Sequence, residues 1–161
     1  MSSGQILEGI VLYLEGSRVH HVSPKGAATF HFGWDPDLLP GEVVVDEVAR
    51  LGHAPFLVHS TSWRLHDGHI VLTYIVCVDR PVRADLSLRD QVVDRSELAR
   101  GHMMGPPTEV EPHHVVEHGL RHLAWLIGDD QALRDALPQW AEALADYQPE
   151  PFRAFGGNLR R

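Results

Sequence analysis

The sequence predicts an α+β fold: a mixed, mostly antiparallel β-sheet followed by C-terminal helices. Runs rich in Val, Ile, Tyr and Phe, separated by Gly, Pro and Asp, fill the chain up to about residue 79. From Pro112 onward, leucine and alanine at helical spacing dominate instead. Strands that precede helices in this way are typical of the α+β class. With 161 residues, we expect a single domain, residues 1–161, with a sizeable core.

Strands are expected throughout the N-terminal third. The runs that predict them are QILEGIVLYLEG (5–16), VHHVS (19–23) and ATFHFGW (28–34). Glu15–Arg18, with the sequence EGSR, is a turn signal between the first two runs. The segment 35–42, DPDLLPGE, is expected to be a loop because it contains two prolines and a glycine. The following segment, VVVDEVARLG, suits either a strand or a helix, and we predict a short helix near residues 43–51.

A β-hairpin is the clearest local unit of the sequence. Two β-rich runs, PFLVHSTSWRL (55–65) and HIVLTYIVCVD (69–79), flank the Asp-Gly turn signal in His66–Gly68. Both faces of the second run are mostly apolar, which predicts a central strand that is covered on both sides. The segment 80–90 is then expected to leave the sheet, and 94–107 to form a short helical turn that runs into a loop.

Helices are expected in the last third of the chain. The first should run from Pro112, which is acceptable in a first helical turn, to a stop signal at Gly128. Asp129 or Asp130 is a candidate N-cap for the next helix. That helix should break near Pro138, because proline cannot donate an interior helical hydrogen bond.

The composition excludes several classes of function. A formal net charge of −8 argues against nucleic-acid binding and against anionic membrane surfaces, both of which require a basic face. No segment approaches the roughly 20 apolar residues of a membrane span, and the N-terminus lacks a secretory signal, so we expect a cytoplasmic protein. The single cysteine, Cys77, should be a buried and inert thiol. Residues 148–161 are rich in Pro and Gly and should form an irregular tail.

The helix expected at 112–128 has one apolar face and one histidine face. Side chains three or four residues apart share a face of a helix. The apolar stripe consists of Val116, Leu120, Leu123 and Ile127. His114, His118 and His122 fall on roughly the opposite side, with Trp125 beside them. These imidazoles should therefore face solvent or something else, rather than the core.

The sequence HVVEH, from His114 to His118, permits two interpretations. H-x-x-E-H is the zinc signature of the inverzincin proteases. In that interpretation, His114 and His118 of this chain would bind Zn²⁺ and Glu117 would act as general base. A catalytic zinc also requires a third protein ligand and a shielded cavity. The glutamates that follow are Glu142 and Glu150, in a short remaining chain. We therefore predict a polar helix face and no cofactor, with zinc as the alternative.

The segment HSTSWR concentrates polar side chains on one predicted strand. Strand alternation would send His59 and Trp63 to one face and Ser60, Ser62 and Arg64 to the other. This segment could form the floor of a pocket, in which Arg64 pairs with a ligand carboxylate or phosphate. The predicted ligand-binding residues are His59, Ser60, Ser62, Trp63 and Arg64. The alternative is a strand with one solvated face and an internal ion pair.

Over residues 5–128 the order of elements resembles a Nudix domain. In that family a strand pair leads to a loop and a helix that carry the pattern G-x5-E-x7-R-E-U-x-E-E-x-G-U. Gly41 and Glu47 stand at the G-x5-E spacing, but Pro55 and Phe56 occupy the Arg-Glu positions and no paired glutamates follow. In the family those glutamates bind Mg²⁺ at the substrate diphosphate. The resemblance therefore implies the fold, and metal-assisted diphosphate hydrolysis is not expected.

These observations lead to one functional hypothesis and two alternatives. We expect a non-catalytic domain that binds a small polar or phosphorylated ligand, or a partner protein, near Trp63, Arg64 and the histidine face. The first alternative is a metal-dependent hydrolase that uses His114, Glu117 and His118. The second is a homo-oligomer whose histidine and Trp125 face is an interface that opens when the imidazoles become charged.

Overall fold

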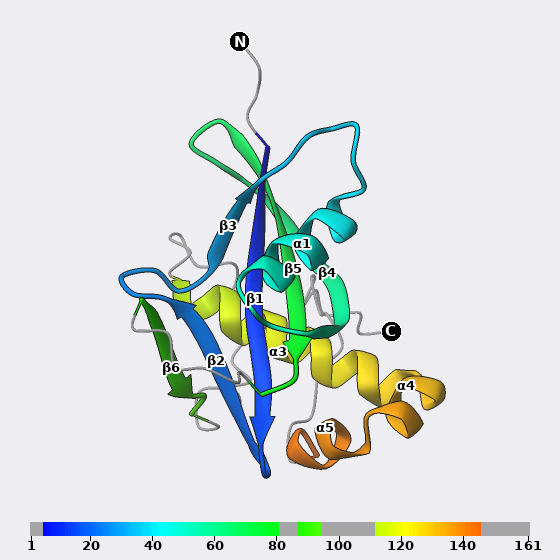
Figure 1. The fold of residues 1–161 in the computed structure, drawn as a ribbon. Coiled ribbons are helices and arrows are strands. Elements are labelled where there is room, and N and C mark those ends of the chain that lie inside the picture. Colours follow the sequence, from blue (N-terminus) through cyan, green and yellow to red (C-terminus); the bar gives the residue numbers. More distant parts are fainter. Residues whose placement is uncertain (1–4, 81–86, 95–111, 146–161) are drawn as a thin grey trace, which may run out of the picture.

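The structure is a computed structural model that describes residues 5–80, 87–94 and 112–145 (Figure 1). Its strands are β1 (Gln5–Glu15), β2 (Arg18–Pro24), β3 (Phe30–Gly33), β4 (Pro55–His66), β5 (His69–Val78) and β6 (Leu88–Val92). Its helices are α1 (Pro40–Arg50), α3 (Pro112–Asp129), α4 (Gln131–Ala136) and α5 (Pro138–Ala143). The helical turn predicted within 94–107, apart from Asp94, and the tail predicted at 148–161 lie outside the described residues.

The strands form one six-stranded sheet in the order β4-β5-β1-β2-β6, and β3 pairs with the first half of β1. Among the described strands, β1 and β5 run parallel, and the other pairings are antiparallel. The predicted class, an α+β fold with a mixed and mostly antiparallel sheet, is therefore confirmed. The predicted central position of the strand at 69–78 is confirmed as well, because β5 lies between β4 and β1.

Two helices cover opposite faces of the sheet (Figure 1). α1 buries Val44 and Val48 against one face, together with Leu7 and Val11 of β1. α3 buries its apolar stripe against the other face, which we call the α3 face. The buried stripe residues are Val116, Leu120, Leu123 and Ile127, as the helical spacing predicted. The core is thus split into two layers by the sheet, which is typical of a sheet with helices on both sides.

α3 approaches the sheet most closely at Gly119. A Cβ atom at this position would lie 2.9 Å from Cδ1 of Ile10 and 3.4 Å from Cγ1 of Ile75. Ile10 and Ile75 are paired on the neighbouring strands β1 and β5. The absence of a side chain at Gly119 therefore allows the helix backbone to pack on this isoleucine pair.

Local signals in the sequence identify the hairpin turn and the starts of α4 and α5, but not the end of α3. Asp67 and Gly68 both have positive φ, at 49° and 79°, as a two-residue hairpin turn requires. Asp130 caps α4 by accepting hydrogen bonds from the amides of Ala132 and Leu133, and Pro138 begins α5. The prediction of a stop at Gly128 was wrong, because α3 continues to Asp129. The Asp130 cap, rather than the glycine, marks the boundary between α3 and α4.

Two further element boundaries differ from the prediction. The helix expected near 43–51 begins earlier, at Pro40, which occupies the first helical turn. The segment 80–90 was expected to leave the sheet, but Leu88–Val92 forms β6 and pairs antiparallel with β2. This prediction was wrong because an edge strand is held by backbone hydrogen bonds on one side and does not require an apolar pattern. None of the described helices combines the length and the hydropathy needed to cross a membrane.

Candidate functional site

A β-bulge in β4 rearranges the predicted polar strand. The pairing with β5 runs His59 with Ile75 and Ser60 with Tyr74, and then shifts so that Ser62 pairs with Thr73. The extra residue inverts the alternation beyond this point. Strict alternation placed His59 and Arg64 on opposite faces, and this expectation was wrong.

Beyond the bulge, the register of β4 sorts its side chains between the two faces. Arg64 is paired with Val71, which lies on the same face of β5 as Ile75. Ser62 and Arg64 therefore share the α3 face with His59. Trp63 and Leu65 point to the face that carries α1.

A row of polar residues crosses the α3 face next to the bulge. Ser62 of β4 pairs with Thr73 of β5, Thr73 pairs with Glu8 of β1, and Glu8 pairs with His31 of β3. The neighbouring row contains Ile75 and Ile10, on which α3 packs. The polar row therefore begins where the contact of Gly119 with the sheet ends.

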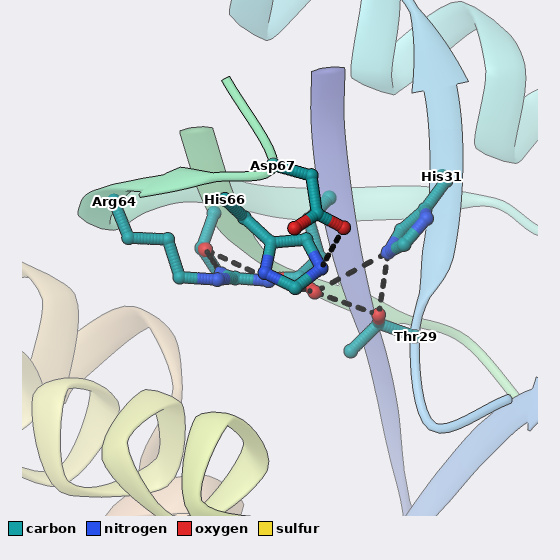
Figure 2. A network of polar contacts seen from close by, with 7 residues as sticks. Thr29, His31, Arg64, His66 and Asp67 are labelled. Atoms are coloured by element: carbon teal, nitrogen blue, oxygen red, sulfur yellow. Dashed lines mark hydrogen bonds and ion pairs between the residues drawn. The ribbon is translucent and has the colours of Figure 1, made fainter. Parts of the chain in front are cut away.

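Glu8 is the centre of this row and is almost completely buried, with 3% of its surface exposed. Arg64 donates two hydrogen bonds to it, from Nη1 to Oε2 at 2.6 Å and from Nη2 to Oε1 at 2.8 Å. Thr73 donates to Oε2 at 2.8 Å, and Thr29 donates to Oε1 at 2.9 Å. Nε2 of His31 lies 3.4 Å from Oε1 (Figure 2). Every acceptor direction of the carboxylate is thus occupied.

The ionisation of Glu8 follows from these contacts. Burial alone would raise the pKa of Glu8, but the hydrogen bonds and charge of Arg64, with the bonds from Thr73 and Thr29, lower it from 4.5 to about 2. The carboxylate is therefore charged at neutral pH and has no lone pair left for a substrate proton. Arg64 is committed to the same pair, which raises the pKa of the guanidinium. The internal ion pair that the sequence offered as an alternative is present, and ligand binding at Arg64 stays a prediction.

Trp63 and Leu65 form the largest exposed apolar feature of β4. Their exposed fractions are 71% and 69%. Both side chains point to the α1 face, opposite Leu72 and Ile70 of β5. β4 is an edge of the sheet as the described residues define it, and its strand partner there is β5. An aromatic and an aliphatic side chain therefore stand exposed beside a strand edge.

The histidine face of α3 lies against β4. A hydrogen bond links the His118 ring to the backbone of Thr61, the bulge residue. The ring centroids of His59 and His122 are 5.1 Å apart, and those of His118 and His122 are 6.2 Å apart. Burial lowers the pKa of all three imidazoles, and for His122 the charges of the other two lower it further. His118 and His122 thus contact β4.

The zinc alternative finds no complete ligand set in the described part of the chain. Glu117, the candidate base, forms an ion pair with Arg121 one turn further along α3. The ring of His114 packs against His113, with 4.1 Å between centroids. Among residues 5–80, 87–94 and 112–145, no group of three or more His, Cys, Asp or Glu side chains is arranged to hold a metal ion. Metal binding by His114 and His118 stays a prediction.

A second polar cluster on the sheet was not anticipated from the sequence. The hydroxyl of Tyr13 donates to Oδ2 of Asp90 at 2.5 Å, and Nδ1 of His20 lies 2.9 Å from Oδ1 of the same carboxylate. Burial and the Asp90 carboxylate raise the pKa of Tyr13. Asp90 belongs to β6, and the pairing of β6 with β2 was not predicted. The sequence therefore did not indicate that Asp90 would lie beside Tyr13 and His20. Glu8, by contrast, was detectable as the acidic interruption of an apolar run.

Two surface hollows of the described structure lie away from the predicted site. One, of about 380 Å³, is lined by Phe56, Arg80 and Trp140, among others. The other, of about 530 Å³, is lined by Arg18, Val92 and neighbouring residues. Neither is lined by the segment 59–64, so the polar row is not the floor of either hollow.

The positions of the Nudix pattern are distributed over a helix and a strand. Gly41 and Glu47 lie on α1, and Glu47 forms an ion pair with Arg50. Pro55 and Phe56, at the positions of the family's Arg-Glu pair, begin β4. The positions of the family's paired glutamates fall at His59 and Ser60, which also lie on β4.

Comparison with known proteins gives a resemblance of fold. No protein-family model and no curated protein matches the chain. One similar solved structure is from a study of MutT from the fish pathogen Aliivibrio salmonicida and from Vibrio cholerae: 14% identity, 60% of this chain and 83% of that chain covered, TM-score 0.44. Another is a candidate Nudix hydrolase: 10% identity, 58% and 59% covered, TM-score 0.39. The predicted Nudix-like resemblance thus holds at the level of fold, and at these TM-scores it carries no argument about activity.

Proposed function

We propose that this protein is a non-catalytic binding domain that recognises a partner polypeptide at the edge strand β4, around Trp63 and Leu65. The observation that carries this proposal is the exposure of Trp63, at 71%, on an edge strand of the described sheet. Tryptophan is enriched among the residues that dominate protein–protein binding energy. Leu65, at 69% exposure, lies two residues further on the same face, so the pair forms one apolar feature.

The strand edge itself supports a polypeptide partner. An edge strand presents backbone N–H and C=O groups, and an extended segment can pair with them by strand addition. Many proteins protect such edges with lysines, with prolines or with very short strands. β4 has 12 residues and no lysine, and its proline stands at the first position. Its register shifts, which also protect strand edges, lie at Phe56 and Thr61, and the segment 62–66 beyond them is regular.

The ionisable groups of the site favour binding over catalysis. The Glu8 carboxylate is saturated with hydrogen bonds, and Arg64 is neutralised by it. Cys77 is fully buried, and burial raises the pKa of its thiol, as expected for an inert residue. Trp63 and Leu65, which are exposed on the opposite face of the sheet, are apolar and match a protein surface better than a charged small molecule.

A synthetic peptide tests the proposal directly. The probe is a soluble, capped peptide of alternating Thr and Val with a lysine at each end, which favours an extended strand. We expect saturable binding, with NMR shift changes centred on β4. The same peptide with alternate backbone amides N-methylated should not bind, because it cannot complete the strand pairing.

Matched variants of the protein complete this test. Trp63→Glu should abolish peptide binding, and Val45→Glu should leave it unchanged, because Val45 is an exposed apolar residue of α1 rather than β4. Circular dichroism and thermal melting verify that both variants fold. Equal binding of the methylated peptide, or undiminished binding by Trp63→Glu, would contradict recognition at the β4 edge.

A further inference from the structure

We propose that the polypeptide that pairs with β4 is the β4 strand of a second copy of this chain, antiparallel about a twofold axis at Arg64. This inference rests on the proposed role of the β4 edge and adds the identity of the partner. An antiparallel pair of identical edge strands is self-complementary, because the twofold axis presents the same backbone pattern to each copy. The side chains and charges of β4 decide whether such a pairing is favourable.

The spacing of the apolar side chains suits an axis at Arg64. Trp63 and Leu65 flank Arg64 symmetrically and point to the same face. In the antiparallel pair, Trp63 of each copy lies opposite Leu65 of the other, which gives two aromatic–aliphatic cross-strand pairs side by side. Ser62 then lies opposite His66 of the second copy. The regular segment 62–66 is the part of β4 that takes part, and the bulge at Thr61 lies outside it.

The charge at the axis is also suited to self-pairing. Two Arg64 side chains would meet across the axis, and like charges directly opposite each other destabilise strand pairing. Each guanidinium, however, is bound twice by Glu8 of its own copy, at 2.6 and 2.8 Å. Both charges are therefore cancelled inside their own protomers. Arg64 also points to the α3 face, whereas Trp63 and Leu65 point to the other.

The size of the contact predicts a weak dimer. Five residues of each strand and four apolar side chains cover less than the roughly 1,200 Å² of a standard stable interface. We therefore expect association at micromolar to millimolar concentration rather than a permanent dimer. In such a reversible dimer, the fraction of β4 edges that is paired depends on the protein concentration.

Analytical ultracentrifugation tests the oligomeric state. At pH 7.5 and concentrations from about 5 to 500 μM, the average mass should rise from 18.0 kDa toward twice that value. Trp63→Glu and Leu65→Glu should remain monomeric over this range. Val45→Glu should associate as the unmodified chain does, because its substituted side chain lies on α1.

Cross-linking tests the register. A mixture of Ser62→Cys chains and His66→Cys chains should form a mixed disulfide on oxidation, because these positions face each other across the proposed axis. Either variant alone should give little disulfide-linked dimer. In the Ser62→Cys dimer each cysteine would face a histidine, and in the His66→Cys dimer each cysteine would face a serine. Cys77 is fully buried, so the wild-type chain serves as the unreactive control.

The outcomes separate this inference from the proposed function. A chain that stays monomeric at 500 μM but binds the Thr/Val peptide at β4 overturns self-pairing and leaves the binding role intact. A monomer that binds no peptide overturns both. A dimer that survives Trp63→Glu, or that cross-links equally well within each cysteine variant alone, assembles through another surface and overturns the proposed pairing.

Discussion

Burial and ion pairing shift the pKa of the Glu8 carboxyl in opposite directions. Desolvation opposes the charged form, and the two bonds from Arg64 together with those from Thr73 and Thr29 outweigh it. A buried ion pair of this kind adds little net stability compared with an apolar pair, but the removal of one partner is strongly destabilising. Loss of one partner leaves the other charge buried without compensation.

Arg64→Leu is therefore expected to destabilise the fold by about 3–5 kcal/mol, measured as the free energy of unfolding in urea. Arg50→Leu is the matched control, because Arg50 pairs with Glu47 on the surface of α1 and is 69% exposed. Exposed pairs contribute about 0–1 kcal/mol. Equal losses in the two variants would show that Glu8 does not depend on Arg64 for its charge.

His21 provides a second residue-scale prediction, in which pH is the variable. The ring is almost fully buried, and desolvation lowers its pKa from 6.5 to about 4, although a hydrogen bond with the backbone of Ala28 opposes the shift. Because the folded pKa lies below the unfolded value, the unfolded chain binds the proton first. The contribution of neutral His21 is therefore complete above pH 6.5 and is lost as pH falls toward 4.

The expected loss from His21 is roughly 3 kcal/mol by pH 4, read as the fall in the free energy of unfolding. His21→Gln, which cannot titrate, should flatten the profile between pH 6.5 and 4. Some slope should persist, since burial also lowers the pKa of His59, His118 and His122. His66→Gln is the control, because that side chain is 67% exposed. A profile left unchanged by His21→Gln would mean that the ring escapes to solvent when it is protonated.

At the scale of elements, features that are set by local interactions were predictable from the sequence, and features that are set by distant strands were not. The apolar stripe of α3 and the Asp67–Gly68 turn are set by neighbours in the chain, and both were predicted. The bulge at Thr61 and the strand Leu88–Val92 are set by pairing with distant strands, and both were missed. The polar row depends on the register of four strands, so Glu8 and Arg64 could not be joined from their positions in the sequence.

The packing of α3 on the sheet gives the element-scale prediction. Gly119→Val should cost about 1–3 kcal/mol, because the added side chain collides with Ile10 and Ile75 in a filled core. Gly128→Val is the matched control on the same helix, since nothing lies within 4 Å of its would-be Cβ. There the change should be neutral or slightly stabilising, because glycine is a poor helix former. Thermal and urea unfolding of the two variants measure the difference. Similar free energies of unfolding for the two variants would show that Gly119 is not the point of closest contact between α3 and the sheet.

At the scale of the whole molecule, charge and apolar exposure have opposite effects on assembly. The chain carries a formal net charge of −8, so two copies repel each other at neutral pH. The proposed contact itself is neutral, since Arg64 and Glu8 cancel within each copy. The attraction then comes from apolar burial at Trp63 and Leu65, which salt does not screen, whereas the repulsion between protomers is screened.

Self-association should therefore strengthen with salt. Raising sodium chloride from about 20 to 200 mM at pH 7.5 shortens the screening length from roughly 20 Å to below 10 Å, and the dimer dissociation constant from sedimentation equilibrium should fall severalfold. Glu42→Lys with Asp46→Lys, both exposed on α1, changes the net charge from −8 to −4, because each substitution adds two units. This variant should associate more tightly at low salt and respond less to added salt. Weaker association in salt would instead mean that ion pairs hold the dimer, which contradicts a neutral contact centred on Arg64.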